Sequence, residues 1–145
     1  MTSSHDDGSS LPCSCPVYRA VTKRAWIDPT TGRLLPAAFV RRTGRDTDGL
    51  SVCLFEGFPS DPDELRRHID AVTHLHCHAL ASLIAGHVRN LGLDVVADSP
   101  THASITGLPY DDDIAESRHR AVQLARLCWM RWHRRRQEGW DTVPL

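Results

Sequence analysis

The sequence predicts a single α+β domain in which two principal helices pack on a small mixed β-sheet. The chain has 145 residues, of which 41% are hydrophobic. This length and composition suit one domain with a substantial core. Five short apolar segments have the alternation or the β-branched content of strands, and two longer segments have the periodicity of amphipathic helices. Strands and helices that do not alternate regularly favour the α+β class.

The five expected strands cover residues 17–21, 36–42, 50–55, 93–97 and 102–106. In the last of them, alternation places Ala103 and Ile105 on one face and the polar residues, His102 first among them, on the other. Residues 98–101, Asp-Ser-Pro-Thr, have the composition of a turn between the last two strands. These segments predict an apolar centre with polar groups along one side.

The first expected helix covers residues 62–73, because Asp61 can cap it and Pro62 suits its first position. The second covers residues 112–137, with aspartates at its start and arginines at its end, as the helix dipole favours. Residues 1–16 are expected to form a disordered tail. A domain at 17–138 follows, and then a C-terminal tail at 139–145.

Net charge and hydropathy indicate which broad classes of protein the sequence suits. The net charge of −1 does not direct the whole chain to nucleic acid or to a membrane. The sequence contains neither a long apolar run nor an apolar block near its N-terminus, so a cytoplasmic protein is expected. Lys23 is the single lysine among 17 basic residues. We interpret this arginine bias as typical of a GC-rich bacterial genome.

A histidine-rich stretch contains His74, His76 and His78. A helix would bring His74 and His78 to one face, whereas a strand would align all three. Imidazoles are zinc ligands, so zinc is a candidate cofactor, although the spacing matches no established zinc pattern. The alternative is a histidine-rich segment that binds no metal.

Arginines mark a second candidate site. Arg19 shares a face of its expected strand with two valines, and the following charged loop holds Arg41, Arg42 and Arg45. Guanidinium groups bind phosphate and carboxylate through paired donors, so these residues could form an anion site. Alternatively, Arg19 lies at a sheet edge and the loop arginines pair with the aspartates of their own loop.

The end of the chain interleaves aromatic residues with arginines. This segment provides the candidate contacts with a partner: Arg131, Trp132, Arg134, Arg135 and Arg136. Such a composition can bind phosphates and stack on bases, or it can dock on a protein. Cations are also favoured at helix ends for structural reasons.

Several stretches together resemble a family of small bacterial proteins of unassigned function. They are Ala38-Phe39, Asp48-Gly49-Leu50-Ser51-Val52, Val88-Arg89-Asn90-Leu91-Gly92-Leu93 and His102-Ala103-Ser104-Ile105-Thr106-Gly107-Leu108-Pro109. More distantly, Val17-Tyr18-Arg19 before an arginine-bearing loop is similar to the opening of RES-domain toxins. That resemblance implies an ADP-ribosyltransferase-like fold and NAD degradation, with Arg19 and Glu56 in catalytic positions. The Gly-Gly-Arg-Trp segment of those toxins is absent here.

The chain contains no glycine-rich phosphate loop and no G-x-S-x-G elbow, and no spacing in it supports Ser-His-Asp chemistry. The leading hypothesis is therefore a non-enzymatic binding or accessory protein of a bacterial locus, contacting a protein or nucleic acid. The alternatives are an NAD-using enzyme, with Arg41, Arg42 and Arg45 on the phosphates, and a zinc protein. The sequence leaves the oligomeric state open.

Overall fold

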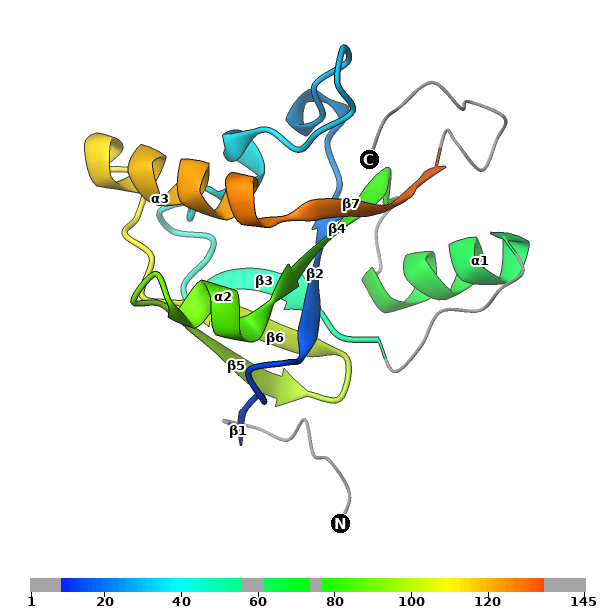
Figure 1. Cartoon of the computed structure of the whole chain (residues 1–145), viewed down its shortest axis with the longest axis horizontal. Coiled ribbons are helices and arrows are strands. Elements are labelled where there is room, and N and C mark those ends of the chain that lie inside the picture. The colour runs from blue at the N-terminus through cyan, green and yellow to red at the C-terminus, as the bar shows by residue number, and fades with distance from the viewer. Residues whose placement is uncertain (1–8, 56–61, 74–76, 135–145) are drawn as a thin grey trace.

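A single antiparallel sheet organises the molecule. The computed structural model describes residues 9–55, 62–73 and 77–134 (Figure 1). The sheet has the order β1-β5-β6-β3-β2-β4-β7. Its strands are β1 (Ser9–Ser10), β2 (Pro16–Val21), β3 (Leu50–Cys53), β4 (Ala79–Ile84), β5 (Asp94–Ser99), β6 (His102–Thr106) and β7 (Trp129–His133).

Every pair of neighbouring strands in this sheet is antiparallel. The α+β class is therefore confirmed, whereas the predicted mixed sheet is wrong. Parallel neighbours need a crossover that returns the chain to the same end of the sheet, and none of the connections between neighbouring strands has that geometry. The β5–β6 pair, for example, is a hairpin with a two-residue turn at 100–101.

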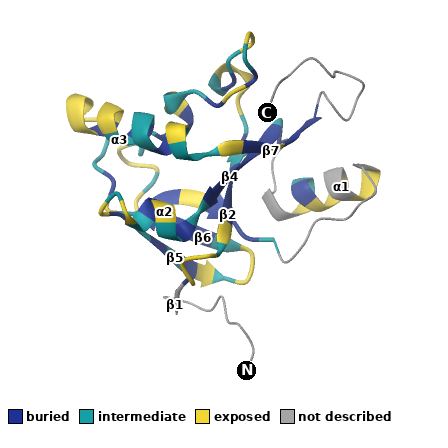
Figure 2. Cartoon of the chain, in the orientation of Figure 1, coloured by how far each residue is buried: buried dark blue, intermediate teal, exposed yellow. Residues whose placement is uncertain are grey.

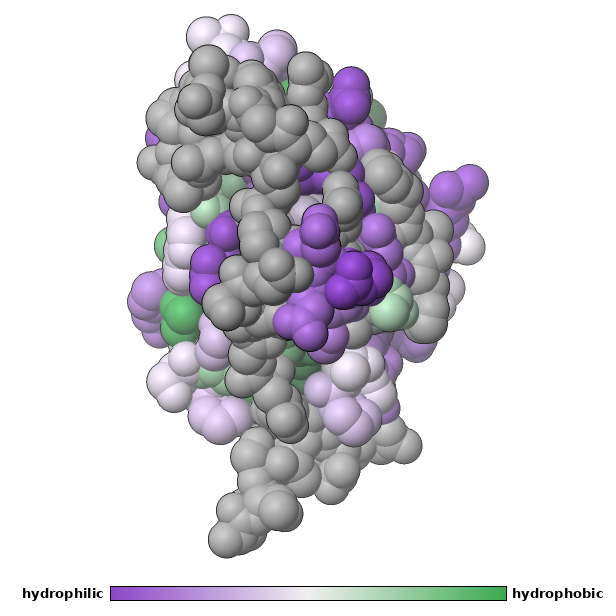
Figure 3. All heavy atoms as spheres, turned by 90° about the vertical axis from the view of Figure 1, so that its right-hand side faces the viewer, coloured by the Kyte–Doolittle hydropathy of each residue, from purple (hydrophilic) through white to green (hydrophobic). Residues whose placement is uncertain are grey.

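Helices cover both faces of the sheet. Helices α2 (Ala85–Arg89) and α3 (Ile114–Leu127) lie on one side and α1 (Pro62–Thr73) on the other (Figure 1). The larger core cluster includes Leu50, Ile105 and Leu124, and a smaller cluster on the α1 side includes Ile69 and Trp132. The central strands are buried, as the dark ribbons of Figure 2 show. Figure 3 views the α1 side, where hydrophilic side chains gather across the middle of the molecule.

The two predicted helices have different outcomes. The helix expected at 62–73 is confirmed, since α1 has those bounds. The helix expected at 112–137 is too long, because α3 covers Ile114–Leu127 and the strand β7 follows it. In β7 the buried residues Met130 and Trp132 alternate with exposed ones, so the chain has changed from helical to strand periodicity. In the described part of the chain, no helix is long and apolar enough to cross a bilayer.

Two further elements differ from prediction. The strand expected at 36–42 is instead a 3₁₀ turn, η2 (Pro36–Phe39), because Pro36 favours the start of a helical turn and Phe39 packs into the core beside α3. The sequence did not indicate strand β4, although it pairs with β2 along its whole length. Its alanines and serine have low strand propensity, and burial between β2 and β7 compensates for this.

The N-terminal segment is part of the fold from Ser9 onwards, which corrects the prediction of a disordered tail to residue 16. Strand β1 pairs with β5, and Leu11 is buried. The carbonyls of Cys13 and Cys15 accept hydrogen bonds from the main-chain amides at the start of α2. Residues 1–8 and the predicted tail at 139–145 lie outside the described residues.

Candidate active site

Three polar side chains from neighbouring strands form a hydrogen-bonded series on the α1 side of the sheet. The distance from Ser51 Oγ on β3 to His102 Nε2 on β6 is 2.5 Å. The distance from His102 Nδ1 to Asp98 Oδ1 on β5 is 2.6 Å. With the proton on Nδ1, the imidazole donates a hydrogen bond to the carboxylate, and Nε2 accepts a hydrogen bond from the serine hydroxyl. A hydroxyl, an imidazole and a carboxylate therefore stand in series.

A β-bulge places the carboxylate. In the β5–β6 register, Ala97 lies opposite Ala103 and Ser99 lies opposite His102, so Asp98 is the extra residue. A bulge of this kind turns side chains away from the regular alternation. The expected turn at 98–101 is shorter than predicted, because β5 continues to Ser99. The carboxylate and the imidazole thus belong to one tight hairpin, four residues apart.

The serine comes from a distant part of the chain. In the β3–β6 register Cys53 lies opposite His102, and Ser51 lies opposite Ser104. Ser51 is therefore the diagonal neighbour of His102 on the same face of the sheet. Gly49, with a φ of +123°, allows this approach, because a Cβ there would lie 2.5 Å from the carbonyl oxygen of Ile105.

Arg19 supports the main chain of Ser51 from the opposite face. Its Nη1 donates to the carbonyl oxygen of Ser51 at 2.9 Å, and its Nε donates to that of Ala38 at 2.7 Å. Burial lowers the pKa of the Arg19 guanidinium to about 10, while the charge of nearby Asp46 acts in the opposite direction. The side chain is thus still charged at neutral pH and is used to join β2, β3 and η2. Arg19 is not at a sheet edge, because β2 lies between β3 and β4, and its donors are directed to main-chain carbonyls rather than to an open anion site.

Ser51 is better placed than Cys53 to be a candidate nucleophile. Burial raises the pKa of the Cys53 thiol to about 11, so this thiol is protonated at neutral pH and inert. Ser51 is exposed, and the side chains of His102 and Asp98 are 37% and 53% exposed. A substrate can therefore reach the serine hydroxyl from solvent.

The loop arginines have structural partners. Arg41 donates to the carbonyls of Asp46, Thr47 and Leu108, and its guanidinium lies 4.0 Å from the centre of the Tyr110 ring. Arg42 forms an ion pair with Asp46 at 3.1 Å, and this hydrogen bond raises the pKa of Arg42.

The Arg42–Asp46 ion pair fits the alternative in which the loop arginines pair with the aspartates of their own loop, whereas Arg41 bonds main-chain carbonyls instead. Arg45 is exposed, and Glu56 lies outside the described residues. The structure thus does not bring Arg19 and Arg41 together with their donors directed to one open point.

Of the predicted metal ligands, His74 and His76 lie outside the described residues. His78 immediately precedes β4 and lines a cavity. Among residues 9–55, 62–73 and 77–134, no three His, Cys, Asp or Glu side chains are grouped to hold a metal ion. The zinc site remains a prediction for the histidine-rich stretch.

Two of the predicted partner contacts are buried. Trp132 and Arg134 are 4% and 7% exposed. Arg134 donates to the carbonyl of Cys77 at 2.7 Å and to Asp70 Oδ1 at 2.5 Å, so it joins β7 to α1. Their burial means that these two side chains do not face a partner. Arg131 is exposed, and Arg135 and Arg136 lie outside the described residues.

Comparison of the chain with known proteins gives no match. No protein-family model, curated protein or solved structure matches the chain. The family resemblances inferred from the sequence therefore remain predictions. The sequence alone did not single out Asp98 as a candidate site residue and did not predict the contact between Ser51 and His102. The one available signal was the alternation that places His102 on the polar face of its strand.

Proposed function

We propose that this protein is a serine-dependent hydrolase, in which Ser51 is the nucleophile, His102 the general base and Asp98 the group that orients the imidazole. One observation carries the proposal, namely the continuous hydrogen-bonded series of Ser51, His102 and Asp98. A serine hydroxyl is a weak nucleophile by itself and becomes effective when an adjacent base removes its proton. The recurrence of this trio on unrelated folds means that its geometry, not its order in the sequence, is what identifies it.

A stabilising role alone does not account for the arrangement. Exposed ion pairs contribute about 0–1 kcal/mol to stability, since water screens them and the side chains lose freedom. All three residues are accessible, so their alignment adds little to the fold. Alignment in an accessible position is what a reaction with an external substrate requires.

The substrate in this proposal is an ester or another activated acyl compound. Ser51 Oγ attacks the carbonyl carbon while its proton passes to His102 Nε2, and Asp98 stabilises the resulting imidazolium. The tetrahedral intermediate then expels the alcohol, which takes the proton from His102. Water attacks the acyl-serine in the same way and gives a proton to His102. The second tetrahedral intermediate then breaks its bond to Ser51 Oγ, so the acid leaves, and Oγ takes the proton from His102. Because the site is open, the acyl group can be part of a larger molecule.

Labelling with a fluorophosphonate probe tests the proposal, since such probes react much faster with activated serine hydroxyls than with ordinary ones. We expect one label per chain, assigned to Ser51 by mass spectrometry of the peptides. Labelling should be lost in Ser51→Ala and in His102→Ala. Ser104→Ala is the matched control, because Ser104 lies opposite Ser51 on the same face and belongs to no part of the series.

Two results would reject the proposal. One is a native, folded protein that takes no label and does not hydrolyse p-nitrophenyl acetate faster than Ser51→Ala does. The other is equal labelling of the native protein and His102→Ala, which would mean that the imidazole does not activate the serine. Circular dichroism of each variant establishes that it is folded.

A further inference from the structure

A second site lies at the other end of the sheet from the Ser51 series. A cavity of about 390 Å³ opens between the chain after β2 and the start of β4 and end of β7. Its described lining residues are Arg24, Ala25, Ile27, Pro29, Leu35, His78 and His133. This volume is within the range of small-molecule sites, about 300–1,000 Å³.

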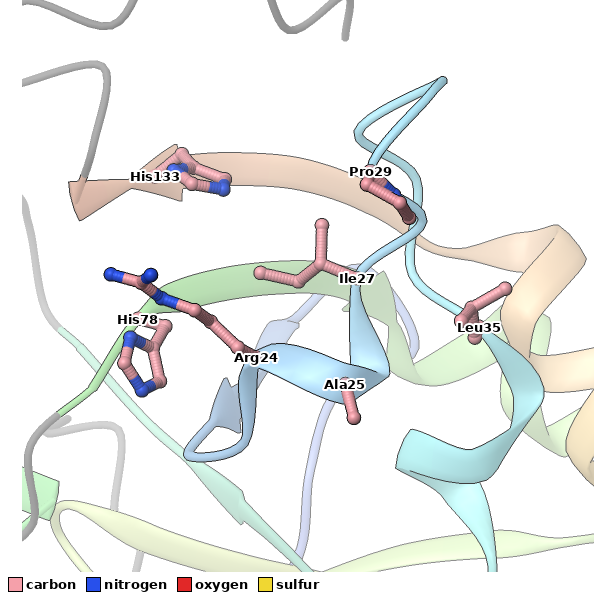
Figure 4. Close-up of a pocket in the computed structure, with 7 residues that line it drawn as sticks. All are labelled: Arg24, Ala25, Ile27, Pro29, Leu35, His78 and His133. Atoms are coloured by element: carbon pink, nitrogen blue, oxygen red, sulfur yellow. The ribbon is translucent and has the colours of Figure 1, made fainter.

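The lining is divided into a polar end and an apolar end. Figure 4 shows that Arg24, His78 and His133 gather at one end, whereas Pro29 and Leu35 lie toward the other. The polar end thus carries the positive charge of the Arg24 guanidinium, with the imidazoles of His78 and His133 beside it. None of the described lining residues is acidic.

Arg24 is the group that sets the charge of the site. It is exposed at the cavity and belongs to the short turn η1 (Arg24–Trp26). In the part of the chain that the structure describes, no carboxylate forms an ion pair with it. This contrasts with Arg42, Arg89 and Arg134, each of which is paired with an aspartate.

We propose that this cavity binds a small amphipathic carboxylate, with its carboxylate paired to Arg24 and its apolar body along Ile27, Pro29 and Leu35. Hydrogen bonds between ionised groups are about twice as strong as neutral ones, so the carboxylate sets the orientation. The apolar walls favour an aliphatic or aromatic body, since burying it removes apolar surface from water. The proposal is independent of the hydrolase function, because the two sites share no residue.

Isothermal titration calorimetry with decanoate, decan-1-ol and decyltrimethylammonium tests the charge and the shape of the site. Decanoate should bind at one site per chain, decan-1-ol more weakly and the cation not at all. Arg24→Gln should weaken decanoate binding about tenfold, the effect of losing one charge-assisted hydrogen bond. Arg33→Gln is the matched control, because Arg33 is exposed in the same connection but does not line this cavity.

Ala25→Phe gives a second test, since Ala25 lines the cavity and a larger side chain there reduces its volume without changing any charge. It should abolish binding of both decanoate and decan-1-ol. Ser51→Ala should bind decanoate as the native protein does, so the result stands whether or not the chain is a hydrolase. Absence of decanoate binding, or equal affinities of Arg24→Gln and Arg33→Gln in folded protein, would overturn the proposal.

Discussion

Ser51 and Cys53 illustrate how the environment selects a reactive group at the scale of single residues. Both side chains lie on the same face of β3 and near His102. The thiol is intrinsically the better nucleophile, but burial raises its pKa to about 11 and it is not in hydrogen-bond series with a base. The weaker hydroxyl has both exposure and a basic partner. In the proposed hydrolase, the position of Ser51 therefore outweighs the higher intrinsic reactivity of the Cys53 thiol.

Asp98→Asn should lower the rate of fluorophosphonate labelling of Ser51 by about 10²–10⁴-fold while the protein stays folded. An amide in place of the carboxylate still forms a hydrogen bond to the imidazole, but it favours the wrong tautomer and does not stabilise the imidazolium. The measurement is the second-order labelling rate constant. Asp112→Asn, an exposed acidic residue elsewhere, is the control and should leave the rate unchanged. A native-like rate in Asp98→Asn would remove the carboxylate from the mechanism.

Arg19→Met should lower the free energy of unfolding by about 2–4 kcal/mol, because two carbonyls in contact with Arg19 lose a charged donor in a buried position. Methionine keeps most of the side-chain volume, so the loss reports mainly on the hydrogen bonds. Denaturant unfolding measures it. Arg45→Met, at an exposed position, should change stability by less than about 0.5 kcal/mol. Equal stability of the two variants would contradict the structural role of Arg19.

At the scale of elements, the site depends on how three strands meet. The bulge in β5 supplies the carboxylate, the first residue of β6 supplies the imidazole, and β3 supplies the hydroxyl. Because side chains alternate along a strand, a one-residue slip of β3 against β6 would move Ser51 to the opposite face. The register is held by the buried pair of Leu50 and Ile105 and by the close approach at Gly49.

Gly49→Ala should destabilise the protein by about 3 kcal/mol and slow labelling of Ser51, since both the positive φ and the contact with Ile105 oppose a Cβ. Gly44→Ala separates the two causes. Gly44 also has a positive φ, +77°, but a Cβ there would meet no atom within 4 Å. Its substitution should cost about 1 kcal/mol and leave labelling unchanged. The same loss of stability in both variants would show that the close approach of β3 to β6 is unimportant.

At the scale of the whole molecule, the two faces of the sheet are covered unequally. The side of α2 and α3 carries the large cluster of buried residues, whereas the smaller cluster on the other side includes Ile69 of α1 among the residues whose burial the structure describes. Arg134 and Asp70 add an ion pair between α1 and β7. Segments with few buried contacts open at lower free energy than the core.

Ile69→Ala should therefore release α1 locally while the sheet stays folded. Hydrogen exchange is the measurement, and the amides of α1 should exchange roughly 30-fold or more faster, which corresponds to the lower end of the 2–5 kcal/mol cost of such substitutions. The amides of β2 and β4 should keep most of their protection. Leu124→Ala on the opposite face is the control and should reduce protection throughout. Equal effects of the two substitutions would show that both faces unfold as one unit.

The features that the sequence by itself determined are those that depend on neighbouring residues. The Asp-Pro start predicts α1 with its observed bounds, and alternation in β6 places His102 on the polar face, opposite to Ala103 and Ile105. The change from helical to strand periodicity near residue 128 is also a local pattern, although the sequence was interpreted as one continuous helix there. Such patterns are readable because helix and strand geometry repeats every few residues.

The features that only the tertiary structure decided are those that join distant segments. Ser51 and His102 are 51 residues apart, and their contact requires β3 to pair with β6 rather than with another strand. Arg19 became a buried support because β3 and η2 present carbonyls to it, which no local pattern encodes. Strand pairing depends on the summed packing of both faces, since many pairings satisfy the same alternation. The candidate active site therefore exists only in the folded sheet.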